Sequence, residues 1–129
     1  MKYLYGAILG DLVGMPYEKN PNIPEHIDIH PEGVNITDDS VMTLATACAI
    51  LKESDFTEEY KYWGNKYFSQ YYGKSFKEWL KSEEAYINHS YGNGCLMRLS
   101  PIPYWAHDDK SGFMIGMPIL VLEYYQKEK

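Results

Sequence analysis

Residues 37–52 read TDDSVMTLATACAILK and, from Val41 on, form an almost wholly apolar helical pattern. Apolar side chains occupy almost every face of that helix, and a helix that is apolar all round is typical of a core. Thr37 precedes the pattern and has the side chain of a helix N-cap. The sequence therefore predicts a helix over 38–52 at the centre of the core, with Thr37 as its cap.

Helical patterning continues on the N-terminal side of this stretch. A stripe of aliphatic residues predicts a helix over 2–15, which Pro16 then disrupts. Three glycines recur every four residues on another face of this helix, at Gly6, Gly10 and Gly14. That spacing indicates close approach by a second helix or a ligand. Residues 19–36 are rich in proline and lack a clean period, so we expect a long irregular loop there.

Four more helices are expected after the central one. They fall at about 58–72, 75–86, 95–99 and 118–126. Thr57 can cap the first, Ser75-Phe76-Lys77-Glu78 has the form of a capping box at the start of the second, and Pro101 and Pro103 stop the third. Because no stretch alternates with period 2, the predicted fold class is all-α, as one compact helical domain.

The composition is that of a single acidic globular domain. The chain has 129 residues, of which 45% are hydrophobic and 23% charged, so we expect one domain over 1–129 and no extended disorder. The net charge of −6 argues against the basic surface that direct nucleic-acid binding requires. It suits a cytosolic enzyme, or a protein that docks on a basic partner. The 13 tyrosines indicate that part of the surface faces water, a ligand or a protein.

The N-terminal segment resembles a signal peptide only in part. Lys2 precedes an apolar stretch over 3–15, but Asp11 interrupts it and no small-residue cleavage site follows. No run approaches the ~18–20 apolar residues of a membrane span. Cys48 and Cys95 fit small core residues in a reducing compartment rather than a disulfide framework. We therefore expect a soluble, cytoplasmic protein without membrane contact.

Candidate chemistry begins with Thr37, Asp38 and Asp39. Adjacent carboxylates beside a hydroxyl supply the hard oxygen ligands that Mg²⁺ or Ca²⁺ prefers. The alternative is that acidic residues at a helix start only offset the macrodipole. The apolar helix behind them and the mutual repulsion of two neighbouring carboxylates favour a cation.

Asp11 and Glu18 form a second candidate pair. They are seven residues apart and share a face if the helix continues past Pro16. Asp11 lies in an otherwise apolar helix and needs a partner if it is buried. Glu18 is placed like a general base or, alternatively, like an exposed charge.

A third candidate is the stretch Tyr91-Gly92-Asn93-Gly94-Cys95-Leu96-Met97-Arg98. Two glycines before a helix leave backbone N–H groups free to cradle an anion such as a phosphate. An ordinary Asn-Gly turn is the alternative. Arg98 would hold a phosphate or an internal carboxylate.

In this order the three signals make a combined pattern. Gly6-x-x-x-Gly10-Asp11-x-x-Gly14-x-x-x-Glu18, Thr37-Asp38-Asp39-Ser40-x-Met42 and Gly92-Asn93-Gly94-x-x-Met97-Arg98-x-x-Pro101-Ile102 resemble motifs of the ADP-ribosylglycohydrolase family. The aromatic stretch with Tyr60, Trp63 and Tyr72-Gly73 is similar too. The resemblance covers about residues 3–105, and 106–129 looks like a divergent tail.

The resemblance implies an all-α fold that binds ADP-ribose over two magnesium ions and hydrolyses ADP-ribosyl bonds. Thr37, Asp38 and Asp39 would be metal ligands, and Glu18 the catalytic residue that activates water or gates the site. The residues expected to bind ligand are Asp11, Tyr91, Gly92, Asn93, Gly94 and Arg98.

The chain also departs from the family pattern. Members are usually more than twice as long, and their second half carries an Asp-x-Asp-Thr/Ser cluster that completes the metal site; this sequence resembles the N-terminal half only and lacks that cluster. We therefore expect weak Mg²⁺ binding in an incomplete site, and hydrolysis only if a homodimer or partner protein supplies the missing half. The alternative is an inactive remnant that acts as an inhibitor or adaptor, blocking a basic nucleic-acid-binding surface on another protein.

Overall fold

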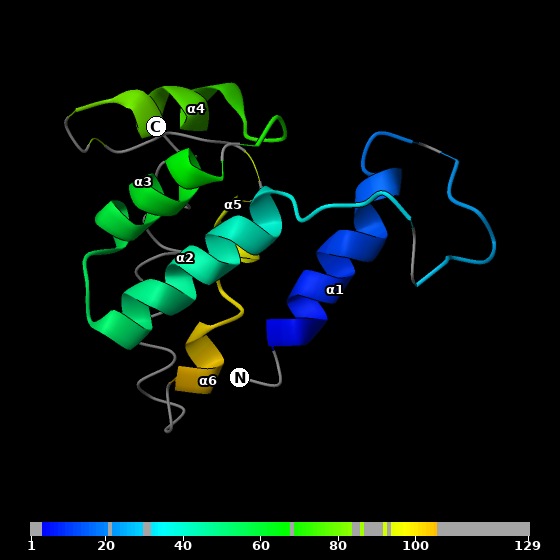
Figure 1. Cartoon of the computed structure of the whole chain (residues 1–129), viewed down its shortest axis with the longest axis horizontal. Coiled ribbons are helices and arrows are strands. Elements are labelled where there is room, and N and C mark those ends of the chain that lie inside the picture. Colours follow the sequence, from blue (N-terminus) through cyan, green and yellow to red (C-terminus); the bar gives the residue numbers. More distant parts are fainter. Residues whose placement is uncertain are drawn as a thin grey trace.

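The computed structural model describes residues 4–20, 22–29, 32–67, 69–83, 86, 92 and 94–105. They form α1 (Leu4–Gly14), the 3-10 turn η1 (Met15–Tyr17), α2 (Asp38–Lys52), α3 (Phe56–Lys66), α4 (Lys74–Lys81), α5 (Gly94–Met97) and α6 (Ile102–Trp105) (Figure 1). No strand occurs within these ranges, which confirms the all-α prediction. The helix expected at 118–126 and the tail 106–129 lie outside the described residues.

Helix α2 is the centre of the core, as its sequence predicts. Figure 1 shows it between α1 and α3, and it contacts these two helices as well as α5 and α6. Met42 is 1% exposed and Ala45 is completely buried. Solvent reaches the two ends of the helix, at Asp39 in the first turn and at Leu51, which is 71% exposed, in the last. The apolar surface of α2 is therefore shared among several neighbours, because none of them is long enough to cover it alone.

The start of α2 has the predicted cap. Thr37 is the N-cap residue, and its Oγ1 accepts a hydrogen bond from the backbone N–H of Asp39 at 3.4 Å. At the other end Glu53 adopts a left-handed conformation with φ of 54°, and its N–H bonds to carbonyl groups of the last turn. Both ends of the helix thus have partners for backbone groups that would otherwise be unsatisfied.

The caps predicted for the next two helices are wrong. Helix α3 begins at Phe56 because Asp55, rather than Thr57, accepts a hydrogen bond from the N–H of Glu58 at 3.0 Å. Helix α4 begins at Lys74 after Gly73, which makes no side-chain cap, so Ser75 lies inside the first turn and cannot form the predicted capping box. Both helices are also shorter than expected, ending at Lys66 and Lys81.

Close packing joins α3 to α4. A Cβ added at Gly64 would lie 2.6 Å from the Leu80 Cδ2 atom, so glycine is what allows the two helices to approach. Beside this contact an apolar cluster includes Tyr60, Tyr72 and Trp79 packed on α2. Tyr60 and Tyr72 therefore belong to the core, whereas Tyr62 and Tyr67 of the same segment are exposed.

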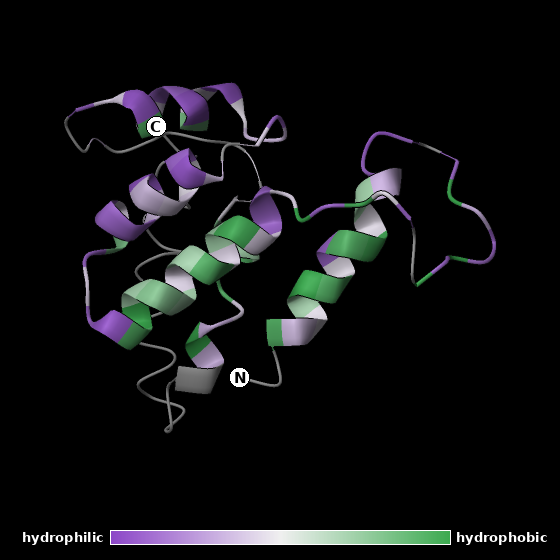
Figure 2. Ribbon diagram, in the orientation of Figure 1, coloured by the Kyte–Doolittle hydropathy of each residue, from purple (hydrophilic) through white to green (hydrophobic). Residues whose placement is uncertain are grey.

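Helix α1 is attached more loosely. None of its residues is buried, although Figure 2 shows that hydrophobic residues make up much of the helix. No atom of the described residues lies within 4 Å of a Cβ added at Gly6, Gly10 or Gly14, so none of the described helices makes the close approach that their spacing suggested. After α1, Pro16 lies in η1, and the described residues of 19–36 form the expected irregular segment.

The C-terminal described segment contains one helix that the sequence did not predict. The short helix expected near 95–99 ends at Met97, before Pro101, and α6 then starts at Ile102 with Pro103 in its first turn, where no backbone N–H is required. Cys95 is buried and Cys48 partly buried, and the described part of the chain contains no disulfide between them. Among the helices that the structure describes, none has the length and hydropathy to cross a membrane.

Candidate functional site

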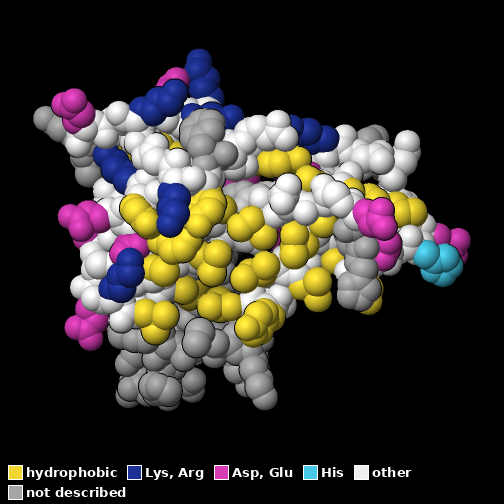
Figure 3. Space-filling view, in the orientation of Figure 1, with side chains coloured by type: hydrophobic (Ala, Val, Ile, Leu, Met, Phe, Trp, Pro, Cys, Tyr) yellow, Lys and Arg dark blue, Asp and Glu magenta, His cyan; other side chains and the backbone are white. Residues whose placement is uncertain are grey.

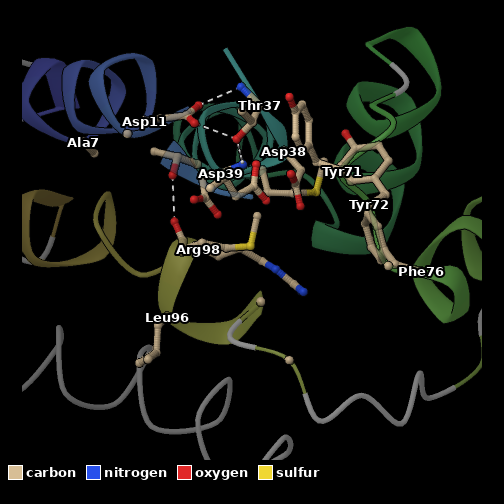
Figure 4. A pocket seen from close by; sticks show the side chains of 18 of the residues that line it. Ala7, Asp11, Thr37, Asp38, Asp39, Tyr71, Tyr72, Phe76, Leu96 and Arg98 are labelled. Atoms are coloured by element: carbon tan, nitrogen blue, oxygen red, sulfur yellow. Dashed lines mark hydrogen bonds between the residues drawn. The ribbon is translucent and has the colours of Figure 1, made fainter. Parts of the chain in front are cut away.

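One cavity brings the predicted motifs together. Its volume is about 730 Å³, within the range of about 300–1,000 Å³ usual for small-molecule sites. Its walls come from α1, η1, the start of α2, the segment from Tyr71 to Phe76, and α5 (Figure 4). The predicted site residues that line it are Asp11, Glu18, Thr37, Asp38, Asp39, Gly92, Gly94 and Arg98. Two others, Tyr91 and Asn93, lie outside the described residues.

Asp11 has the partner that its apolar setting requires. Its Oδ1 accepts a hydrogen bond from the Thr37 hydroxyl at 2.6 Å, and its Oδ2 accepts from the backbone N–H groups of Thr37 at 2.8 Å and Ser40 at 3.2 Å (Figure 4). A carboxylate at this place also complements the positive end of the α2 macrodipole. Asp11 thereby ties α1 to the start of α2, and most of its acceptor capacity is used inside the protein.

Thr37, Asp38 and Asp39 present oxygen atoms on one wall. The Thr37 hydroxyl donates its proton to Asp11 and accepts from Asp39 N–H, which leaves one of its two lone pairs available. Burial raises the pKa of Asp38 to about 6, with further contributions from the charges of Asp39, Glu18 and Asp11. Burial and the charge of Asp11 also raise the pKa of Asp39. The wall is therefore a place where negative charge is costly unless a cation or proton offsets it.

The raised pKa of Asp38 has a definite consequence for stability. The ordinary value is 3.8, so between about pH 4 and 6 the folded protein binds more protons at this site than the unfolded chain does. Stability then falls as the pH rises through this window, because ionised Asp38 is held in an unfavourable place. Since the side chain is only partly buried, solvent screening limits the effect to about 1 kcal/mol.

The side chains of this wall are of the type that binds Mg²⁺, but they are too few to surround the ion. Two carboxylates and a hydroxyl are hard oxygen ligands, and a divalent cation would relieve the repulsion around Asp38. No group of three or more acidic, histidine or cysteine side chains able to hold a metal ion is found within the described ranges. The residues present therefore fit one side of a magnesium site.

Glu18 lies where the α1–η1 segment ends and lines the same cavity as Asp38. Its side chain is exposed, and its charge contributes to the raised pKa of Asp38. The 3-10 turn continues the helical path past Pro16, so the seven-residue spacing does bring Asp11 and Glu18 to one cavity. A carboxylate with access to water and to the ligand space has the properties of a general base.

Arg98 is held in place by aromatic rings. Its guanidinium carbon lies 5.1 Å from the ring centre of Tyr60 and 5.7 Å from that of Phe76. A Cβ added at Gly94 would lie 2.8 Å from an Arg98 Nη atom, so glycine makes room for the guanidinium. Because α5 has only four residues, its macrodipole is small, and Arg98 is the stronger candidate for holding an anion.

An aromatic wall was not among the predicted site residues. Tyr71, Tyr72 and Phe76 line the cavity on the side that faces Asp38 (Figure 4). Burial and the nearby charge of Asp38 raise the pKa of Tyr72. The sequence signal for this wall was Tyr72-Gly73 in the aromatic stretch of the family resemblance, but the helix expected over 58–72 gave no indication that Tyr71 faces a cavity.

Comparison with known proteins gives one match. A family model described as ADP-ribosylglycohydrolase matches residues 1–115, which is most of the chain. No curated protein and no solved structure matches this chain. The matched range contains all the elements that build the cavity.

Proposed function

Because this chain belongs to the ADP-ribosylglycohydrolase family, we propose that its cavity binds an ADP-ribosyl group and contributes to hydrolysis of ADP-ribosyl bonds. The observation that carries the proposal is the convergence of three distant motifs on one cavity of ligand size. Carboxylates lie on the α1–α2 side, Arg98 projects from α5, and aromatic rings form the facing wall (Figure 4). A ribose, a diphosphate and an aromatic base each find suitable chemistry there.

Each residue has a role in this proposal. Asp38, Asp39 and the Thr37 hydroxyl hold Mg²⁺ from one side, and Asp11 positions Thr37 through its hydrogen bonds. The metal, when bound, polarises the ribosyl oxygen atoms or an attacking water. Glu18 acts as general base and takes a proton from a water molecule whose oxygen attacks the anomeric carbon of the ribose. The bond between that carbon and the nitrogen or oxygen of the modified side chain breaks, and the leaving group keeps the bonding electrons and takes a proton from solvent.

The one-sided donor set implies that the isolated chain binds Mg²⁺ weakly. Mg²⁺ dehydrates reluctantly and keeps most of its water when few protein ligands are present. In this proposal a second copy of the chain or a partner protein completes the site, and turnover by the chain alone is low. The exposure of apolar side chains on α1, with Tyr5 at 72% and Leu9 at 50%, supports such an association. Figure 3 shows hydrophobic side chains gathered over α1 and α2.

Calorimetry with ADP-ribose, with and without Mg²⁺, tests the binding part of the proposal. We expect the wild type to bind ADP-ribose and to be stabilised by it, because a ligand of the native state raises the melting temperature by mass action. Asp38→Ala and Asp39→Ala should each abolish Mg²⁺ binding. The matched control is Glu25→Ala, which removes an exposed carboxylate in the loop outside the cavity.

A release assay on ADP-ribosyl-arginine and ADP-ribosyl-serine tests the hydrolytic part. Slow release that depends on protein concentration and disappears in the Asp38→Ala variant would support a site completed by association. Absence of ADP-ribose binding in the wild type would refute the proposal and leave the inhibitor or adaptor role as the better hypothesis.

A further inference from the structure

The cavity lining holds more negative than positive charge, which leaves room for a further cation beside the diphosphate of an ADP-ribosyl ligand. Four carboxylates line it, from Asp11, Glu18, Asp38 and Asp39. Among the lining residues that the structure describes, Arg98 is the one with a cationic side chain. A diphosphate carries two negative charges, and bringing it to this acidic cavity calls for more positive charge than one guanidinium provides.

A second cation lies beside the cavity. Lys19 directly follows Glu18, and its Nζ atom is 4.8 Å from the ring centre of Tyr71, a residue of the aromatic wall. The contact joins the segment after η1 to the turn before α4, so the ammonium lies against a residue that lines the cavity. Within the described part of the chain, no hydrogen bond or salt bridge engages this exposed ammonium.

We propose that Lys19, held against the ring of Tyr71, binds the diphosphate of the ligand and is the counterpart of Arg98 in this cavity. The inference rests on the proposed function, since it assigns one part of the ADP-ribosyl group to one side chain. A cation–π contact at an exposed site is weak and orients the ammonium without using its three N–H donors. Lys19 is thus positioned before the ligand arrives and still has its full donor capacity.

Lys66 provides a comparison within the same chain. Its Nζ lies 5.2 Å, 5.7 Å and 5.4 Å from the ring centres of Tyr62, Trp63 and Tyr67, and it donates a hydrogen bond to the Tyr62 hydroxyl at 3.1 Å. None of these four residues lines the cavity. Lys66→Ala therefore removes an exposed lysine packed on aromatic rings, with the same change in net charge as Lys19→Ala.

Two probes separate a phosphate contact from a general effect on the cavity. Calorimetry on the full-length chain should compare ADP-ribose, which carries the diphosphate, with adenosine, which carries none. We expect Lys19→Ala to weaken ADP-ribose binding by about threefold to tenfold and to leave adenosine binding unchanged. The loss should shrink at high salt, because exposed charges are screened. Lys19→Arg should retain ADP-ribose binding, and Lys66→Ala should change neither ligand.

Substitutions of Tyr71 test the positioning contact. Tyr71→Phe keeps the ring and should retain the ratio of ADP-ribose to adenosine affinity, whereas Tyr71→Leu should lower that ratio. If the wild type binds ADP-ribose but Lys19→Ala changes the affinities for ADP-ribose and adenosine equally, or changes neither, this inference is overturned while the proposed function stands. A wild type that binds no ADP-ribose would overturn both.

Discussion

Replacing Asp11 tests how the two halves of the cavity are held together. Asp11→Ala removes one acceptor group that receives three hydrogen bonds, two from backbone N–H groups and one from the Thr37 hydroxyl. Hydrogen bonds to charged groups contribute about 1.5–3 kcal/mol each when buried. Water in the cavity replaces part of each bond, so about 0.5–1 kcal/mol apiece is the better value here. With about 0.5 kcal/mol for the macrodipole, the expected loss is about 2–3.5 kcal/mol.

Urea denaturation and thermal melting measure this loss directly. For a chain of 129 residues the melting temperature should fall by about 6–15 °C. Asp11→Asn keeps one acceptor oxygen but loses the charge, so it should cost roughly half as much. The matched control is Glu18→Ala, which removes an exposed carboxylate from the same segment and should stay within about 0.5 kcal/mol of wild type. An Asp11→Ala variant as stable as Glu18→Ala would refute the idea that Asp11 holds the start of α2.

Three further predictions concern charge, helix contact and the core. Asp38→Asn should stabilise the metal-free protein by about 1 kcal/mol above pH 7 and leave its stability below pH 4 unchanged. The reason is that it removes a carboxylate whose pKa is raised to about 6. Urea denaturation across this pH range measures the effect. Gly64→Ala should destabilise the protein by about 1–2 kcal/mol because the added Cβ meets Leu80. Gly6→Ala has no described atom near its added Cβ and should stabilise the protein by about 0.5–1 kcal/mol through helix propensity. Thermal melting measures both effects. Met42→Ala should cost about 2–5 kcal/mol in urea denaturation, as for other fully buried side chains.

Specific outcomes would contradict these three predictions. A gain from Asp38→Asn that is equal at pH 4 and pH 8 would mean that ionisation of this side chain is not the cause. Equal effects of Gly64→Ala and Gly6→Ala would show that α3 and α4 do not pack as closely as described. A loss below about 1 kcal/mol for Met42→Ala would place α2 at the periphery of the fold.

The sequence was most informative where a local rule determines the structure. The dense apolar pattern after Thr37 was enough to predict both the central helix and its cap, because burial and capping depend on neighbouring residues. The predicted caps at Thr57 and Ser75 failed for a related reason. Several polar residues lie near each helix start, and small differences in backbone path decide that Asp55 and Gly73 precede the first turns. Helix existence was therefore easier to predict than helix boundaries.

The candidate site was predictable as a set of motifs and not as an arrangement. Asp11, Asp38 and Arg98 each stood out in the sequence. No local sequence pattern showed, however, that Asp11 binds the start of α2 or that Arg98 packs between aromatic rings. Tyr71 carried no signal, since a tyrosine in an aromatic segment has the same local pattern whether it lines a cavity or a core. Its role depends on the turn before α4, which ends the helical path earlier than periodicity suggests.

The sequence by itself determined that the chain is helical, that residues 38–52 form its core helix, and which residue types are available for chemistry. These properties follow from hydrophobic period, capping and side-chain chemistry, which act over a few residues. Only the tertiary structure decided that Asp11 holds the start of α2, that the small-residue face of α1 opens on a cavity rather than on a helix, and that Lys19 meets Tyr71. These contacts join residues 26 or more positions apart, and they depend on the packing of several elements at once, which no local pattern contains.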